Sequence, residues 1–459
     1  MAVDFQHKDY KKRIDTWKMV DNVVNKEELE QYLRVLNSED ISPENNERNE
    51  FYKEFAIFYN FTGFTLSGLI GEVYAKSPSV NLPATLDYLN ESADGKGKSI
   101  QQMSQETTRE VTKKARSGLY VSYPEIGRAV SAQDVARGVR ATISHIDAKR
   151  IINWREGMVD GVSKVTLVVF TSTKEIIDDD GFGVEEKDTW RELSLKDGIF
   201  YDVTWWKDEE EWVFREEVPL DGRGVPFTEI PFCFVGSQDN DPSVDTVDIS
   251  DLADINLGHY RNSADWEDST FYIGQSQPWM SGIDDAHIKL IRKHGLYSGS
   301  RKVMPVPAGE TYGYATPDPN PLARVAMQDK MELAKGLGAR FIQPGTVAKT
   351  AAQALGEAKV AHSILGLIAK NVSEAYTRAI GFVGQYMNAE TDDATFELNS
   401  EFDAGTDDAE MINAKVTTWM QGGIPLDDHF NNMKKAGLVA HDKKFEDFQN
   451  EIDAERGNI

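Results

Sequence analysis

Apolar side chains recur at helical spacing through residues 1–90, and residues 48–74 carry them most densely. Apolar residues three or four positions apart share one face of a helix, so the pattern predicts helices with an aromatic core face. Glycines within this stretch indicate close helix contacts or a break. A further helix is expected over 99–117 and a strand over 118–124. The expected core face comprises Phe51, Phe55, Phe58, Tyr59, Phe64, Leu66, Leu69 and Ile70.

Between residues 140 and 236 the pattern changes from helical to alternating. Residues 164–176 and 198–218 are rich in β-branched and aromatic residues, which favour strands. The charged segment KDEEE predicts a turn between two strands, and IIDDDGFGVEEKD predicts a hairpin loop. Cys233 lies in the apolar run IPFCFVG, which indicates a buried strand and an unreactive thiol.

The stretch DISDLADINLGHYRNSADWEDSTFYIG, residues 248–274, contains residue types from which active sites are often made. A helix here places Leu252, Tyr260 and Phe271 on one face and His259 mostly on another. The residue four positions after His259 is a serine, which is no metal ligand. The pattern therefore predicts a structural helix rather than a catalytic one.

Residues 284–338 predict two amphipathic helices around a short β-segment. The loop 341–350 contains the breaker pair Pro344-Gly345. Residues 351–387 then give the longest helical pattern, which would reach ~55 Å as one helix. Its apolar stripe contains four candidate packing residues, Ile364, Ile368, Val372 and Val383. The last 70 residues are acidic and mostly helical in pattern.

Composition narrows the classes of protein. The 459 residues include 76 acidic and 50 basic ones, a formal net charge of −26. Tight binding of nucleic acid over the surface needs a basic face and is not expected, although DNA could pass without sticking. A single cysteine excludes an intramolecular disulfide and a cysteine-based zinc site. Without an apolar signal region or a run of 18 apolar residues, we expect a soluble protein made in a reducing compartment.

No catalytic or cofactor motif is complete. NESADGKGKSIQQM resembles a phosphate-binding loop, but Ser92 stands where the first glycine is required, so a polar turn before a helix is favoured. A calcium loop over 176–188 would begin at Ile176 instead of a carboxylate. The patterns G-x-S-x-G and H-E-x-x-H are absent. We therefore expect no enzyme activity, no metal and no cofactor.

Several strings, in their order along the chain, resemble the portal proteins of tailed bacteriophages, in particular a portal-like family catalogued as a domain of unknown function. None is an enzymatic signature, so the resemblance is one of architecture, and it spans most of the chain. The strings are IINW (151–154), IPF (230–232), DLADINLGHYRNSADWE (251–267), MPVPAGETYGY (304–314), KGLGARFI (335–342) and SILGLIAKNVSEAYTRAI (363–380).

The resemblance implies an α+β portal fold: a wing with helical and β-rich parts, stem helices flanking a small α/β clip, a long tunnel-adjacent helix and a helical crown. Portal proteins form a ring, usually of twelve subunits, at one capsid vertex. The expected segments are the wing at 1–275, with a helical N-terminal part and a β-rich part at about 140–236; the first stem helix at 276–295; the clip at 296–318; the second stem helix at 319–340; the tunnel loop at 341–350; the long helix at 351–390; and the C-terminal crown at 391–459.

The resemblance also implies roles for individual residues. Lys349 would give a ring of positive charge near DNA phosphates, an attraction that salt screens, while a plain solvent-facing lysine is the alternative. The candidate clip residues are Lys302, Met304, Pro305, Tyr312 and Tyr314, and the candidate tunnel-loop residues facing DNA are Gln343, Pro344, Gly345, Thr346, Val347, Lys349 and Thr350.

The implied function is a channel for DNA packaging and ejection that also docks the terminase motor and tail or adaptor proteins. The implied partners are further copies in the ring, double-stranded DNA without sequence specificity, the terminase large subunit, a head–tail adaptor and the major capsid or scaffold protein, with no membrane. Such a protein is made in the host bacterial cytoplasm and resides at the portal vertex of the virion capsid. Twelve copies at −26 would carry roughly −300, which discourages DNA from sticking.

Two alternatives stay open. One is another capsid-associated head–tail connector or assembly protein that lacks a channel-lining stem. The other is an enzyme of unknown type, such as a nuclease.

Overall fold

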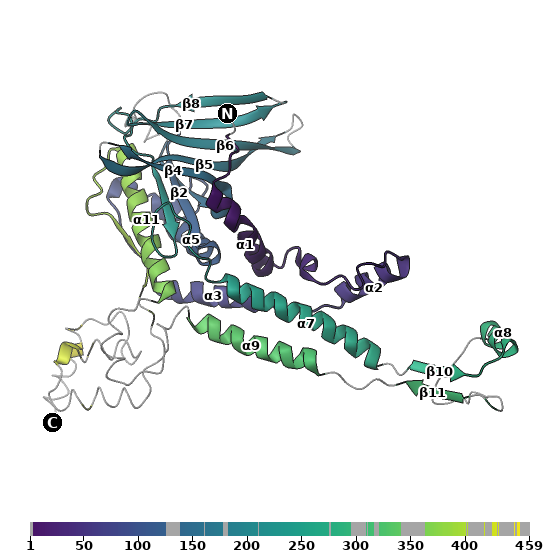
Figure 1. Ribbon diagram of the computed structural model, residues 1–459. Coiled ribbons are helices and arrows are strands. Elements are labelled where there is room, and N and C mark those ends of the chain that lie inside the picture. Colours follow the sequence, from purple (N-terminus) through teal and green to yellow (C-terminus); the bar gives the residue numbers. More distant parts are fainter. Residues whose placement is uncertain are drawn as a thin grey trace. The chain divides into compact units, whose positions relative to one another are not determined.

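The protein is described here from a computed structural model (Figure 1), which covers residues 3–124, 138–159, 161–177, 182–209, 211–274, 277–294, 309, 311–315, 321–340 and 363–400, with a few residues between 402 and 449. The chain forms two compact units, residues 1–400 and 401–459. In the first unit, helices and antiparallel strands occupy separate stretches of the chain, so the predicted α+β class is confirmed.

Short helices make up most of the first 114 residues. Their starts follow ordinary capping chemistry: Ser42 accepts from Asn45 N before α2, and Ser99 and Gln102 form a reciprocal capping box before α5. The elements are α1 (Lys8–Asn25), η1 (Leu29–Tyr32), α2 (Pro43–Glu54), α3 (Phe61–Val73), β1 (Ser79–Asn81), η2 (Ala84–Leu86), α4 (Leu89–Ser92) and α5 (Ile100–Lys114).

Two antiparallel sheets follow. A three-stranded sheet has the order β3-β2-β9, and a five-stranded meander has the order β4-β5-β6-β7-β8 (Figure 1). Strands β5 and β6 pair as far as Ile177 and Val184, so residues 176–177 and 184–188, which were expected in a hairpin loop, are strand residues instead. Strands β7 and β8 pair across the expected charged turn. The elements are β2 (Arg116–Ser122), β3 (Thr142–Asp147), η3 (Ala148–Arg150), β4 (Ile151–Val159), β5 (Val162–Ile177), β6 (Val184–Lys196), β7 (Ile199–Asp208), β8 (Glu211–Glu217) and β9 (Phe232–Gly236).

The core of the first unit lies where the three-stranded sheet meets α5 and α11 (Ile364–Met387). Tyr120 of β2 and Phe232 of β9 both pack against Phe170 of β5, joining the two sheets. Cys233 is buried in β9, and burial raises the pKa of its thiol to about 12, which keeps it protonated and unreactive.

The chain then extends into a helix pair. Helix α7 (Ser250–Gly274) runs antiparallel to α9 (Leu322–Arg340), and the two pack side by side (Figure 1). Between them lie β10 (Gln277–Ser281), α8 (Asp285–His294) and β11 (Thr311–Ala315), with β10 and β11 paired as an antiparallel ribbon. The unit ends with β12 (Thr395–Glu397), which pairs with β1.

The structure differs from the expected segments at three places. Residues 277–281 form a strand, so 276–295 is not one stem helix, and the helix that packs against α9 is α7. Helix α11 begins at Ile364 because Ser363, with extended backbone, caps it by accepting from Gly366 N; residues 351–362 lie outside the description. Residues 395–397 belong to the first unit through β1, not to a crown beginning at 391.

Candidate assembly surface along the helix pair

One face of α7 is buried against the N-terminal helices through polar side chains. Asn256 accepts from Thr62 N at 3.1 Å and donates to the Tyr59 carbonyl at 2.9 Å. Ser263 donates to the Ile57 carbonyl at 2.6 Å and accepts from Ile57 N at 2.9 Å. These bonds satisfy the backbone of the turn between α2 and α3, which is why polar residues occupy a buried helix face.

His259 lies on this buried face, contrary to the expectation that it faces elsewhere. Its side chain sits edge-on between the rings of Tyr59 and Phe61, with centroids 5.7 and 5.6 Å away, and is 1% exposed. Within the described part of the chain, its Nδ1 has no hydrogen-bond partner. Burial and the nearby Lys330 lower the pKa, so the imidazole is neutral at pH 7. A neutral histidine packed between aromatic rings is a core residue rather than a proton carrier.

Helix α9 packs closely on α7 at a glycine. A Cβ on Gly258 would lie 2.9 Å from Cε of Lys330, so the absence of a side chain lets the lysine stem cross α7 there. The Lys330 ammonium donates to Asn262 Oδ1 at 2.6 Å. Together these contacts fix the register of the two helices.

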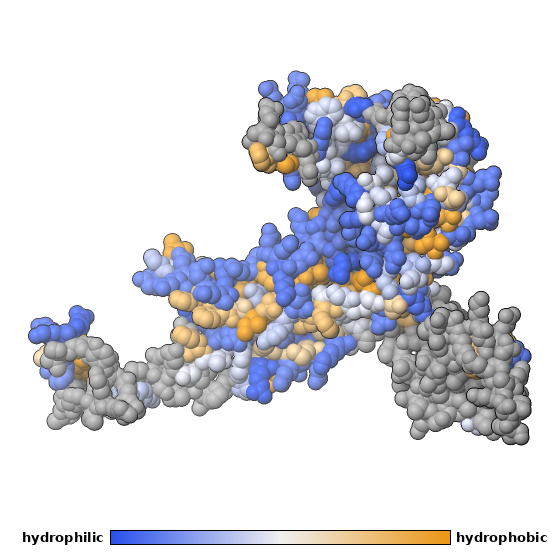
Figure 2. Space-filling model, turned by 180° about the vertical axis from the view of Figure 1, so that it is seen from behind, coloured by the Kyte–Doolittle hydropathy of each residue, from blue (hydrophilic) through white to orange (hydrophobic). Residues whose placement is uncertain are grey.

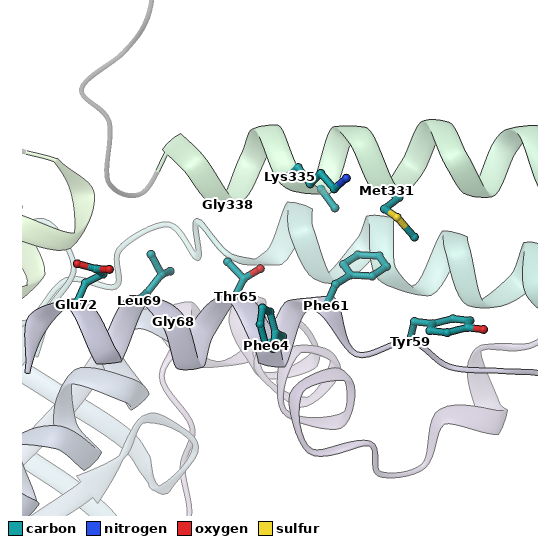
Figure 3. A pocket seen from close by; sticks show the side chains of 11 residues that line it. Tyr59, Phe61, Phe64, Thr65, Gly68, Leu69, Glu72, Met331, Lys335 and Gly338 are labelled. Carbon is teal, nitrogen blue, oxygen red and sulfur yellow. The ribbon is translucent and has the colours of Figure 1, made fainter. Parts of the chain in front are cut away.

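An apolar groove runs between α3 and α9 (Figure 3). It encloses about 580 Å³, and Met331 of α9 and Phe61 of α3 face each other across it. Phe64 is 83% exposed, and no atom lies within 4 Å of the Cβ position of Gly68. Among the described lining residues, Glu72 carries a negative charge and Lys335 a positive one. The lining consists of Tyr59, Phe61, Phe64, Thr65, Gly68, Leu69, Glu72, Met331, Ala334, Lys335 and Gly338.

A row of half-exposed aromatic rings joins α2 to α7. Phe55 stacks between Phe51 and Phe271, with centroids 6.3 and 6.4 Å apart, and about half of each side chain is exposed. Beside the row, Arg48 pairs with Asp268 at 2.6 Å. Phe51, Phe55, Tyr59 and Phe64 were expected on a core face but are exposed instead. Figure 2 shows apolar patches among polar side chains in this region.

The exposed aromatics show where pattern reasoning fails. Helix α2 ends at Glu54 and α3 starts at Phe61 behind its cap Asn60, so the phenylalanines of 48–74 do not share one face. The sequence signal that could have revealed this is the acidic run PENNERNE immediately before Phe51, since a strongly charged helix seldom lies inside a core.

The predicted site residues fall into two groups. Tyr312 and Tyr314 lie in β11 of the ribbon, while Lys302, Met304 and Pro305 lie outside the described residues. All of the expected tunnel-loop residues, Gln343, Pro344, Gly345, Thr346, Val347, Lys349 and Thr350, also lie outside them. On α11, Ile368, Val372 and Val383 are buried and Ile364 is half-buried.

Within the described parts of the chain, no three histidine, cysteine or acidic side chains come together as a metal site. Among the helices that the structure describes, none is long and apolar enough to cross a membrane.

Comparison with known proteins gives one family and distant structures. A family model described as a domain of unknown function, DUF4055, matches residues 248–387, which include α7, the ribbon, α9 and α11. No curated protein matches the chain. Among solved structures, a chain from "Neck of empty GTA particle computed with C6 symmetry" is 13% identical, with a TM-score of 0.39 over 80% of this chain and 87% of that chain. At this TM-score the likeness supports no functional inference.

Proposed function

We propose that the protein is a portal-type ring subunit of a phage-like particle, with a structural rather than catalytic role. The observation that carries the proposal is the antiparallel pair α7–α9 with the β10–β11 ribbon inserted between its helices, in the segment that the DUF4055 model matches. An inserted helix pair with a small β-tip is the arrangement that the portal resemblance implies for a stem and its clip.

The geometry shifts the proposed segment boundaries. In this proposal α7 and α9 form the stem, and residues 277–315 form the clip, with α8 inside the clip rather than in the stem. Helix α11 packs on β9, α5 and β2, which belong to the proposed wing. Residues 341–350 remain the proposed tunnel loop.

A ring also needs a surface for its neighbour. Cyclic assemblies use heterologous interfaces, in which two different patches of one subunit meet on adjacent copies. The α3–α9 groove is a patch of this kind, since it combines an 83% exposed phenylalanine, Phe64, with open space at the Cβ position of Gly68. We assign a second copy of the chain as its occupant in the ring. Exposed apolar groups gathered in a groove favour association over solvation.

The test is the native mass of the purified full chain, with negative-stain images of the same fraction. A ring of about a dozen subunits with a central hole is expected. A protein that stays monomeric or dimeric at the salt concentration used for DNA packaging, even with scaffold protein present, would contradict the proposal. Deleting 341–350 should then leave the ring intact while impairing DNA packaging in an infection assay; loss of the ring would contradict the tunnel-loop assignment.

The alternative, a connector without a channel-lining stem, makes a different prediction. Because it lacks a stem–clip–stem hairpin, it gives residues 277–315 no role in docking the packaging motor. Replacing residues 277–315 by a short Gly-Ser linker keeps the helix pair and removes the ribbon. In the portal proposal this variant still assembles but no longer recruits the packaging motor, whereas an unimpaired motor interaction would favour the alternative.

A further inference from the structure

A second cavity lies where the loop before α5 meets β3, η3 and β5. It encloses about 570 Å³, and its lining is mainly polar. Four cationic side chains line it, Lys96, Lys98, Arg150 and Arg191, against two carboxylates. This formal surplus of two positive charges stands out in a chain whose net charge is −26.

The two carboxylates are already engaged. Asp94 Oδ1 accepts from the backbone N–H groups of Lys96 and Lys98, at 2.7 and 3.0 Å. Glu106 pairs with the Lys98 ammonium at 2.7 Å. The local acids therefore shape the loop and neutralise Lys98, which leaves the other cations to be considered.

Arg191 is also compensated. Its Nε and Nη2 donate to the Asp202 carboxylate at 2.8 and 2.6 Å, and Tyr120 donates to the same carboxylate. This geometry is a two-pronged arginine–carboxylate pair, which holds the guanidinium rigidly. Arg191 therefore contributes shape and a fixed wall to the cavity.

Arg150 differs from Lys98 and Arg191, each of which is paired with a carboxylate. Its Nε donates to the Thr171 carbonyl at 2.7 Å, which fixes the guanidinium against β5. Among the residues that the structure describes, no carboxylate forms an ion pair with it. Burial lowers the pKa of Arg150, which reflects the cost of holding this charge away from water. The charge of Asp147 raises the pKa of Arg150, but that carboxylate is ion-paired with Lys114, so an anion in the cavity would add a counter-charge for Arg150.

The remaining lining suits an oxyanion. Ser144, Ser172 and Thr173 are among the lining residues that carry hydroxyl groups, and Lys96, which also lines the cavity, is exposed. Guanidinium and hydroxyl donors make charge-assisted hydrogen bonds to phosphate oxygens. The α5 N-terminus is not needed for this, because Ser99 and Gln102 cap it reciprocally.

We propose that this cavity binds a phosphate group, with Arg150 as its principal partner and Lys96 and the hydroxyl groups as supporting donors. The loop ADGKGKS thus contributes a lysine side chain to a phosphate site, although it is not a nucleotide-binding P-loop. The site is independent of ring formation and goes beyond the proposed function. The phosphate could be free inorganic phosphate or a phosphodiester of double-stranded DNA.

Calorimetric titration of the full-length protein distinguishes the two sources. One arm titrates sodium phosphate against a sodium chloride reference at equal ionic strength, and the other titrates a short DNA duplex. We expect saturable binding in at least one arm, at one site per subunit. Arg150→Gln should weaken that binding tenfold or more, and Lys96→Ala should weaken it less, because only the former removes the fixed guanidinium.

The matched control is Arg155→Gln, which removes the same charge from an exposed position on β4 outside the cavity. It should bind as the unchanged protein does. Thermal unfolding of each variant checks the fold, and the exposed Lys96→Ala provides a readout even if Arg150→Gln is unstable. No saturable binding in either arm, or an equal loss in Arg155→Gln, would overturn the proposal.

Discussion

At the scale of single residues, Asp21 shows how buried charge is stabilised. Its carboxylate lies 2.9 Å from the Lys113 ammonium, 3.0 Å from that of Lys114 and 2.5 Å from that of Lys149, at the junction of α1, α5 and η3. Burial alone would raise the pKa of Asp21, but the lysine charges outweigh it and lower the pKa to about 2. The ionised form is therefore part of the folded state.

This shift predicts the direction of an acid effect. The folded pKa lies below the ordinary value near 3.8, so the unfolded chain binds the proton first. The stabilisation, about 2 kcal/mol from this shift, is complete above pH 4 and is lost as the pH falls toward 2. In urea unfolding, the stability difference between the unchanged protein and Asp21→Asn should shrink by that amount between pH 4.5 and 2. A constant difference would show that Asp21 is not ionised in the fold.

His259 gives the opposite case, a titratable group whose burial costs stability. Its lowered pKa means that the unfolded chain gains a proton below about pH 6.5 while the folded imidazole stays neutral, so acid destabilises the fold. We expect His259→Phe, which fills the space between Tyr59 and Phe61 without an unpaired nitrogen, to gain in thermal stability relative to the unchanged protein as the pH falls from 8 to 5.5. A gain that does not depend on pH would assign the effect to packing alone.

At the scale of elements, α11 carries the largest share of helix burial in the core. Its buried face contacts β9, α5 and β2, and Asn371 donates to the Gly236 carbonyl at 3.0 Å to fix the helix on β9. Two isoleucines of the apolar stripe differ in burial: Ile368 is 1% exposed, whereas Ile364, in the first turn of the helix, is half-buried.

This difference in burial separates two otherwise identical substitutions. Ile368→Ala should cost about 2–5 kcal/mol of unfolding free energy, because it opens a cavity in the core. Ile364→Ala should cost about 1 kcal/mol or less, because its side chain is already partly hydrated. Denaturant unfolding of the two variants measures the difference between their losses of unfolding free energy. Equal losses would show that Ile364 packs as tightly as Ile368.

At the scale of the whole molecule, the proposed ring makes assembly separable from folding. Phe64 is 83% exposed in one subunit, so Phe64→Asp should leave the thermal unfolding of the unassembled chain within about 0.5 kcal/mol of the unchanged value. Because the groove is the proposed contact with a second copy, the same variant should sediment as smaller particles.

The matched control is Met158→Asp on β4, which changes another exposed apolar side chain, 71% exposed, away from the groove. It should assemble normally. If both variants assemble normally, the groove is not part of the ring contact, although the ring itself would stand. If both fail, the loss reflects added negative charge rather than this surface.

Helices and strands that depend on neighbouring residues alone could be predicted from the sequence. Alternation at 164–176 and 198–218 predicts strands because side chains in a strand alternate between faces, and Ser99 predicts a helix start because its side chain caps the backbone. The burial of Cys233 follows from an unbroken apolar run for the same local reason. The portal resemblance also came from sequence alone.

Which helices and strands pack against one another became evident from the three-dimensional structure alone. The β10–β11 ribbon follows α7, and the chain then returns so that α9 packs on α7. His259 is buried because Tyr59, in the turn before α3, and Phe61, in α3, pack against it. The tertiary structure also leaves Phe51 and Phe64 exposed, and it brings Arg150 to a cavity that residues of the loop before α5 and of β6 also line. Such contacts depend on long-range packing, which the period of a hydrophobic pattern does not encode.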